Sequence, residues 1–198
     1  MSEKSRKEKK LMAVRGDLAE RVIGIANRKG RTVYSFVNEV IEQAIEADYM
    51  DSSLKNIVEF HKLLKVEKES GAVITAKDNL LFLIEKLYPL EKEALLERWY
   101  ASGRWYGKYL QIKFLDGGKL GMLERLLDAC TWDSSEIQLR ENGESLVLNC
   151  VSLWSSKEYT ELASKFLEGI IHVLGYETVK NDVSKGLIVL EFRKKGSS

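Results

Sequence analysis

The chain has 198 residues, of which 44% are hydrophobic and 31% are charged. This balance is typical of a folded globular protein and argues against an intrinsically disordered one. No apolar run reaches the roughly 18 residues that a membrane span requires, and the charged N-terminus lacks the apolar stretch of a signal peptide. We therefore expect a cytoplasmic protein.

The net charge of +1 hides a basic N-terminal end. Residues 1–31 hold ten Lys or Arg against four Asp or Glu, and the rest of the chain is slightly acidic. A basic end on a near-neutral chain favours contact with phosphate groups, although a solubilising tail has the same composition. Composition alone leaves both alternatives open.

The first fifty residues predict an arm, a strand and two helices. Residues 1–9 lack apolar periodicity and are expected to form a flexible basic arm, and residues 10–15, KLMAVR, a short strand. A helix with one apolar face follows and ends at Gly30. Thr32 is placed to cap a second helix. The apolar faces of the two helices hold Leu18, Val22 and Ile25, then Phe36, Val37, Val40, Ile41, Ala44 and Ile45.

Residues 51–198 predict a larger α+β domain with an antiparallel sheet and helices on one face. Helices are expected near residues 53–70, 80–87, 91–110, 120–129 and 157–174, with Pro89 between the second and the third. The turn signal Asn142-Gly143 predicts a hairpin. The expected strands are Glu136–Arg140, Leu146–Val151, Glu177–Asp182 and Leu187–Arg193.

The strand at residues 10–15 has no partner nearby in the sequence. A strand this short is not stable alone, so we expect it to pair with the same strand of a second chain. Two such strands form an antiparallel ribbon over the interlocked helices of a homodimer. Residues 10–50 are therefore predicted to be a dimerisation domain.

The segment around residues 9–48 resembles the ribbon-helix-helix family, especially its small plasmid and archaeal repressors. The likeness is carried by the join RKGRT between two helices and by the apolar spacing around it. The resemblance implies a dimer that binds double-stranded DNA, with the ribbon in the major groove and the start of the second helix on the phosphate backbone. The resemblance implies that the chain is a transcriptional regulator, which we expect in the nucleoid.

Two strand registers are open, because side chains alternate between faces. One directs Lys9, Leu11, Ala13 and Arg15 to DNA, and the other Lys10, Met12 and Val14. We favour the first because it exposes Arg15, which is suited to guanine, although family members usually carry polar groups where Leu11 and Ala13 stand. With the phosphate contacts that the family implies, the expected DNA-binding residues are Lys9, Lys10, Leu11, Ala13, Arg15, Arg31, Thr32 and Ser35.

The aromatic segment RWYASGRWYGKYL in the C-terminal part contains Gly103 and Gly107, one turn apart. Such a pair predicts the close approach of another helix or of a ligand. We favour core packing over a ligand, because aromatic stripes at helical spacing are usually core. The ligand alternative places a pocket at Trp99, Gly103, Tyr106 and Gly107.

The same segment, followed by a helix with EGII at residues 168–171 and two closing strands, resembles the four-vinyl-reductase type of domain. That family includes sensors of small apolar ligands, so the resemblance implies a ligand-sensing role. Many members carry cysteines in the closing strands, whereas Val183 and Val189 lie near those places here. The resemblance therefore implies no redox or metal chemistry.

No motif predicts an enzyme, a cofactor or a metal site. Cys130 and Cys150 lack CxxC spacing, and the chain has two histidines, His61 and His172. Besides a ligand-modulated regulator, two alternatives remain. One is an antitoxin-like or scaffold protein whose C-terminal domain binds a protein partner. The other is a small-molecule sensor or catalytic domain whose N-terminal segment serves only for dimerisation.

Overall fold

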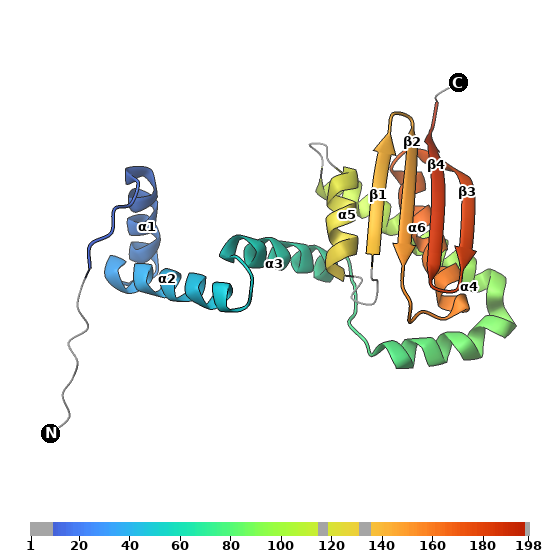
Figure 1. The fold of residues 1–198 in the computed structure, drawn as a ribbon, viewed down its shortest axis with the longest axis horizontal. Coiled ribbons are helices and arrows are strands. Elements are labelled where there is room, and N and C mark those ends of the chain that lie inside the picture. Colours follow the sequence, from blue (N-terminus) through green and yellow to red (C-terminus); the bar gives the residue numbers. More distant parts are fainter. Residues whose placement is uncertain (1–9, 115–118, 131–135, 197–198) are drawn as a thin grey trace. The chain divides into compact units, whose positions relative to one another are not determined.

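The structure, a computed structural model, describes residues 10–114, 119–130 and 136–196 (Figure 1). Six helices and a four-stranded sheet in these residues give the predicted α+β class. The chain divides into two compact units, Met1–Glu59 and Phe60–Ser198. The division falls within helix α3 (Leu54–Glu69).

The N-terminal unit is built on a helical hairpin of α1 (Gly16–Arg28) and α2 (Val33–Tyr49). The predicted turn at Gly30 is confirmed, since this glycine has a φ of 63°, which favours a residue without a Cβ. Residues 10–15 form no strand in the single chain. A ribbon requires a second chain, so it stays a prediction.

In the C-terminal unit, the antiparallel sheet has the order β1-β2-β4-β3. Its strands are β1 (Glu136–Asn142), β2 (Ser145–Val151), β3 (Tyr176–Ser184) and β4 (Leu187–Lys194). Gly143 forms the β1–β2 turn with a φ of 60°, as the sequence predicts. In β2 and β4, buried residues alternate with more accessible ones, as expected when helices cover one face of a sheet.

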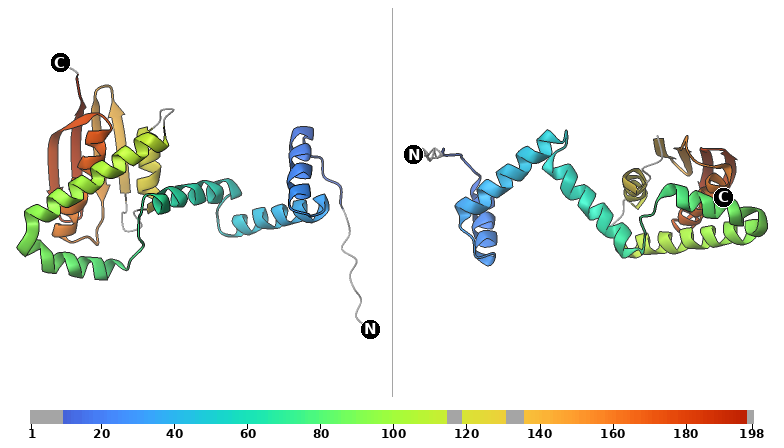
Figure 2. Two further views of the ribbon diagram at one scale, coloured as in Figure 1. Left: turned by 180° about the vertical axis from the view of Figure 1, so that it is seen from behind. Right: turned by 90° about the horizontal axis from the view of Figure 1, so that it is seen from below.

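The helices of this unit are α4 (Lys77–Lys113), α5 (Lys119–Cys130) and α6 (Lys157–Val173). Helix α6 lies on one face of the sheet and α4 packs against α6, as both views in Figure 2 show. Helix α5 lies beside β1. The core forms where these layers meet, around Leu110, Leu148, Ile170, Leu190 and Phe192.

Helix α4 consists of two helical segments joined across a kink. We predicted two helices separated by Pro89, and the break lies at Glu91, where φ is −134° and ψ is 36°. A proline inside a helix lacks an N–H and crowds a carbonyl of the preceding turn. Here the backbone leaves helical geometry at Glu91, two residues after the proline, and a second helical segment follows.

Candidate functional site

The segment predicted to read DNA is exposed to solvent. Leu11, Met12 and Val14 are all uncovered, and Lys10, Ala13 and Arg15 are exposed beside them. Since both faces of the segment are accessible in the single chain, both strand registers remain open. Lys9 and the arm at residues 1–9 lie outside the described residues.

Arg15 lies at the boundary between this segment and α1, where it occupies the N-cap position. Its guanidinium group lies 3.0 Å from the Asp17 carboxylate, and the two side chains are 74% and 63% exposed. An ion pair this exposed contributes little. The Arg15 side chain can therefore leave the Asp17 carboxylate and bind a stronger hydrogen-bond acceptor.

The residues predicted to contact phosphate come together at the start of α2. The hydroxyl group of Thr32 accepts the N–H of Ser35 at 3.1 Å, which confirms Thr32 as the cap and occupies that amide. Arg31 forms an ion pair with Glu39 and donates to the Ser35 hydroxyl at 3.1 Å. A phosphate at this point would therefore compete with Glu39 and Ser35 for the guanidinium group of Arg31.

The apolar side chains of the N-terminal unit are largely uncovered. In its described residues, the buried hydrophobic side chains are those of Ala26 and Ala47, both with no exposed surface. The large aliphatic side chains that α1 and α2 leave exposed are Leu18, Ile23, Val33, Val40, Ile41 and Ile45. This unit thus has the apolar residues of a core without burying them.

In the C-terminal unit, a cavity of about 220 Å³ lies between α6 and the sheet. We call it the inner cavity. Trp99 closes one side, and its ring lies edge-on to Tyr159 with 5.8 Å between centroids. Its apolar walls come from Trp99, Leu127, Ile137, Leu148, Cys150, Tyr159, Ala163, Phe166, Leu167 and Ile188.

The inner cavity has one polar end. The hydroxyl groups of Ser152 and Ser155 lie 2.7 Å apart in a hydrogen bond. The Thr160 hydroxyl group donates to the Ser156 carbonyl at 2.6 Å and accepts the N–H of Gly186 at 3.0 Å. Ser152, Ser155, Thr160 and Gly186 all line the cavity. The arrangement suits an apolar molecule with one hydrogen-bonding group.

The four residues of the predicted pocket fall in three places. Trp99 lines the inner cavity, and Tyr106 lines a second hollow of about 430 Å³, which we call the outer hollow. Gly103 and Gly107 instead face the backbone of α6, because a Cβ on Gly103 would lie 2.0 Å from the Phe166 oxygen and one on Gly107 2.9 Å from the Ile170 oxygen. Of the two alternatives that the sequence left open, these glycines serve the close approach of a helix.

The outer hollow lies at the C-terminal end of α3. Its walls come from Glu67, Ser70, Gly71, Ala72, Ser102, Trp105, Tyr106, Leu126, Leu127 and Phe166. Leu127 and Phe166 also line the inner cavity, so the two spaces adjoin at these side chains.

Sequence reasoning missed the polar end of the inner cavity. Ser152 and Ser155 follow β2, Thr160 is in the first turns of α6, and Gly186 is in the β3–β4 turn. No motif joins residues so far apart along the chain. Gly186 carries a local signal, since glycine suits a tight turn: its φ is 72°, and a Cβ there would lie 2.5 Å from the Ser152 oxygen.

The two histidines differ in their surroundings. His61 is exposed on α3, whereas His172 on α6 is partly buried, with Nδ1 2.7 Å from the Tyr100 hydroxyl and Nε2 2.7 Å from the Thr178 hydroxyl. Thr178 donates its proton to Glu168 at 2.6 Å, so it accepts the Nε2–H of His172. Burial lowers the pKa of His172 and outweighs the raising effect of Glu168. This network joins α4, α6 and β3.

Two further findings concern the described residues alone. None of their helices has the length and apolar composition needed to cross a membrane. Within residues 10–114, 119–130 and 136–196, no three His, Cys, Asp or Glu side chains come together in a way that would hold a metal ion.

Comparisons with known proteins include a distant structural likeness. No model of a known protein family matches the chain, and no curated protein matches it. A solved structure described as "Probing the function of heme distortion in the H-NOX family" is 17% identical and covers 72% of this chain and 89% of its own, with a TM-score of 0.40. We draw no conclusion about function from a likeness this distant.

Proposed function

We propose that this protein is a sequence-specific DNA-binding transcriptional regulator that acts as a homodimer in the nucleoid and responds to a small apolar ligand. The observation that carries the proposal is the uncovered apolar surface of the N-terminal unit. The resemblance of residues 9–48 to ribbon-helix-helix repressors supports it.

A second copy of the chain would cover the apolar side chains that the N-terminal unit leaves exposed. Full burial of one Val, Leu or Ile side chain stabilises a protein by about 1.5–3 kcal/mol. The single unit leaves Leu18, Val40, Ile41 and Ile45 exposed. If a second copy covers these side chains, the apolar faces form one core, and residues 10–15 of the two chains pair as a ribbon.

The exposed segment before α1 supplies the proposed DNA contacts. The major groove admits a two-stranded ribbon, and an arginine that contacts guanine with two hydrogen bonds gives base discrimination. We assign this role to Arg15, with Leu11 and Ala13 beside it on the same face. Arg31 and the capped start of α2 are assigned to the phosphate backbone.

The inner cavity is the proposed ligand site. An apolar cavity of about 150 Å³ takes up benzene, so a cavity of about 220 Å³ has room for one ring with a few further atoms. The polar end around Ser152 and Ser155 favours a ligand with one hydroxyl or carbonyl group. The resemblance of the C-terminal part to a family with sensors of small apolar ligands supports this role.

A mobility-shift assay with genomic fragments at two salt concentrations tests the DNA-binding part. We expect binding that weakens as salt rises, because phosphate contacts release counterions. Arg15→Ala is expected to lower affinity for the preferred fragment about tenfold or more, since a good bidentate contact contributes about 1–3 kcal/mol of discrimination. The dimer is expected to persist.

The matched control is Arg21→Ala, which removes the same charge from an exposed position on α1. This variant should keep the ratio of specific to non-specific affinity. If the protein does not bind DNA even at low salt, the proposal fails and the sensor and scaffold alternatives take its place.

Thermal unfolding of the full chain with benzyl alcohol tests the ligand site. We expect this small aromatic alcohol to raise the Tm, because a ligand that binds only the folded state stabilises it. Ala163→Leu fills the inner cavity and should abolish the shift, whereas Ala101→Leu, at an exposed position on α4, should keep it. A shift that survives Ala163→Leu would assign the ligand elsewhere.

A further inference from the structure

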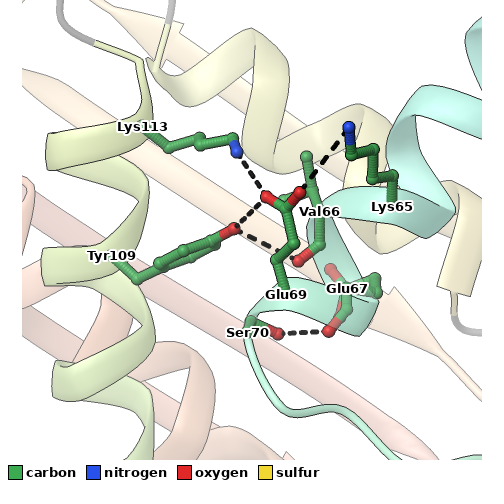
Figure 3. A network of polar contacts seen from close by, with 7 residues as sticks. All are labelled: Lys65, Val66, Glu67, Glu69, Ser70, Tyr109 and Lys113. Atoms are coloured by element: carbon green, nitrogen blue, oxygen red, sulfur yellow. Dashed lines mark hydrogen bonds and ion pairs between the residues drawn. The ribbon is translucent and has the colours of Figure 1, made fainter.

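The outer hollow contains a carboxylate that lacks a cationic partner among the described residues. Glu67 is half-buried near the end of α3 and accepts a hydrogen bond from the Tyr106 hydroxyl group. The nearby lysines are engaged elsewhere: Lys113 and Lys65 both pair with Glu69, Lys65 at 3.8 Å (Figure 3). Lys65 and Lys113 thus neutralise Glu69, and neither lysine forms an ion pair with Glu67.

Partial burial of a carboxylate is costly unless a positive charge or several hydrogen bonds compensate for the lost water. Desolvation raises the pKa of Glu67, and this effect exceeds the lowering effect of the hydrogen bond from Tyr106. A cation in the hollow would relieve this cost.

The remaining walls of the outer hollow also suit a cation with an apolar body. Trp105, Tyr106 and Phe166 contribute aromatic rings, and tryptophan is the best partner for a cation–π contact. Trp105 is 54% exposed and is held by parallel stacking on Tyr109, with centroids 5.8 Å apart. The rings thus offer a fixed surface that a ligand can reach.

The C-terminal end of α3 also favours a cation in the outer hollow. Residues 70–72, which follow the last turn of α3, line the outer hollow. The C-terminus of a helix carries a partial negative charge that favours cations. Leu126 and Leu127 supply the apolar part of the wall.

From this combination we propose that the outer hollow binds an organic cation, namely an amine or quaternary ammonium group on a small apolar or aromatic body. Glu67 neutralises the positive charge, and Trp105 and Tyr106 contact the cationic head. The site requires neither DNA nor a second copy of the chain, so it can be tested independently of the proposed regulatory function.

Isothermal titration of the full chain with benzyltrimethylammonium tests the site. The wild-type protein should bind this cation and should not bind phenylacetate, an anion of similar shape. Glu67→Gln keeps the side-chain volume and an acceptor for Tyr106 while it removes the charge. It is expected to weaken cation binding at least about tenfold, as for the loss of a charge-assisted contact.

Two further variants make the test specific. Glu85→Gln removes an equal charge from an exposed position on α4 outside the hollow, and it should bind the cation as the wild type does. Trp105→Leu keeps an apolar side chain without the ring, and it should weaken binding. The proposal is overturned if wild-type protein fails to bind the cation at millimolar concentration, if phenylacetate binds as tightly, or if Glu67→Gln and Glu85→Gln have the same effect.

Discussion

Three glycine residues determine how closely α4 and α6 approach each other. Gly103 and Gly107 on α4 meet the backbone of α6, and Gly169 on α6 meets the backbone of α4, where a Cβ would lie 2.3 Å from the Tyr100 oxygen. At such distances even one methyl group requires the helices to separate. The close contact has a cost, because a glycine loses more backbone entropy than an alanine when it folds into a helix.

Gly103→Ala is therefore expected to destabilise the protein by about 3 kcal/mol or more, since overpacking against backbone cannot be relieved by a side-chain rotation. Chemical denaturation of the full chain measures this change. Gly121→Ala is the control, because its Cβ would meet no atom within 4 Å. It should be neutral or stabilise α5 by up to about 1 kcal/mol. Equal stability of the two variants would mean that the close contact is absent in solution.

At the residue scale, packing residues were easier to predict from the sequence than residues that line a cavity. The spacing of Gly103 and Gly107 indicated a close approach, and the structure shows that a helix approaches them. Trp99, which belonged to the less favoured ligand-pocket alternative, lines the inner cavity. The serine and threonine residues at its polar end were not predicted, because a single hydroxyl carries no local pattern.

At the scale of elements, local periodicity predicted most of the fold. Helices α1, α2, α3, α5 and α6 and all four strands lie within a few residues of their predicted ranges. Apolar spacing, Thr32 as a cap and the Asn142-Gly143 turn depend on neighbours in the sequence, so the sequence shows them directly. The break between the two segments of α4 was predicted from Pro89, because a proline disrupts the helix around it.

The inner cavity belongs to the same scale and was beyond prediction for a different reason. Its walls come from α4, α5, α6 and three strands. Which side chains leave a space between these elements depends on packing distances that no local pattern records. The sequence therefore predicted a pocket on one aromatic helix, whereas α6 and the sheet supply most of the walls of the inner cavity.

At the scale of the whole molecule, the two units differ in how far each buries its own apolar residues. The C-terminal unit encloses a core between α6 and the sheet, with Ile170, Leu190 and Leu148 fully buried. In the described part of the N-terminal unit, the fully buried hydrophobic side chains are two alanines, whereas larger ones such as Leu18 and Val40 are exposed. A unit of this size is marginal on its own, and the proposed second copy would supply the missing burial. Dimerisation through the N-terminal unit is thus the central claim.

Sedimentation equilibrium of the full chain and of Ile41→Glu tests this claim most directly. Ile41 is exposed on α2 in the single chain, so a charge there costs the monomer little and opposes burial by a second copy. The wild-type protein should have twice the 22.6 kDa mass of one chain, and Ile41→Glu should have the mass of one chain. Wild-type protein that remains a monomer at the concentrations used for DNA binding, or a variant that stays fully dimeric, would contradict the account.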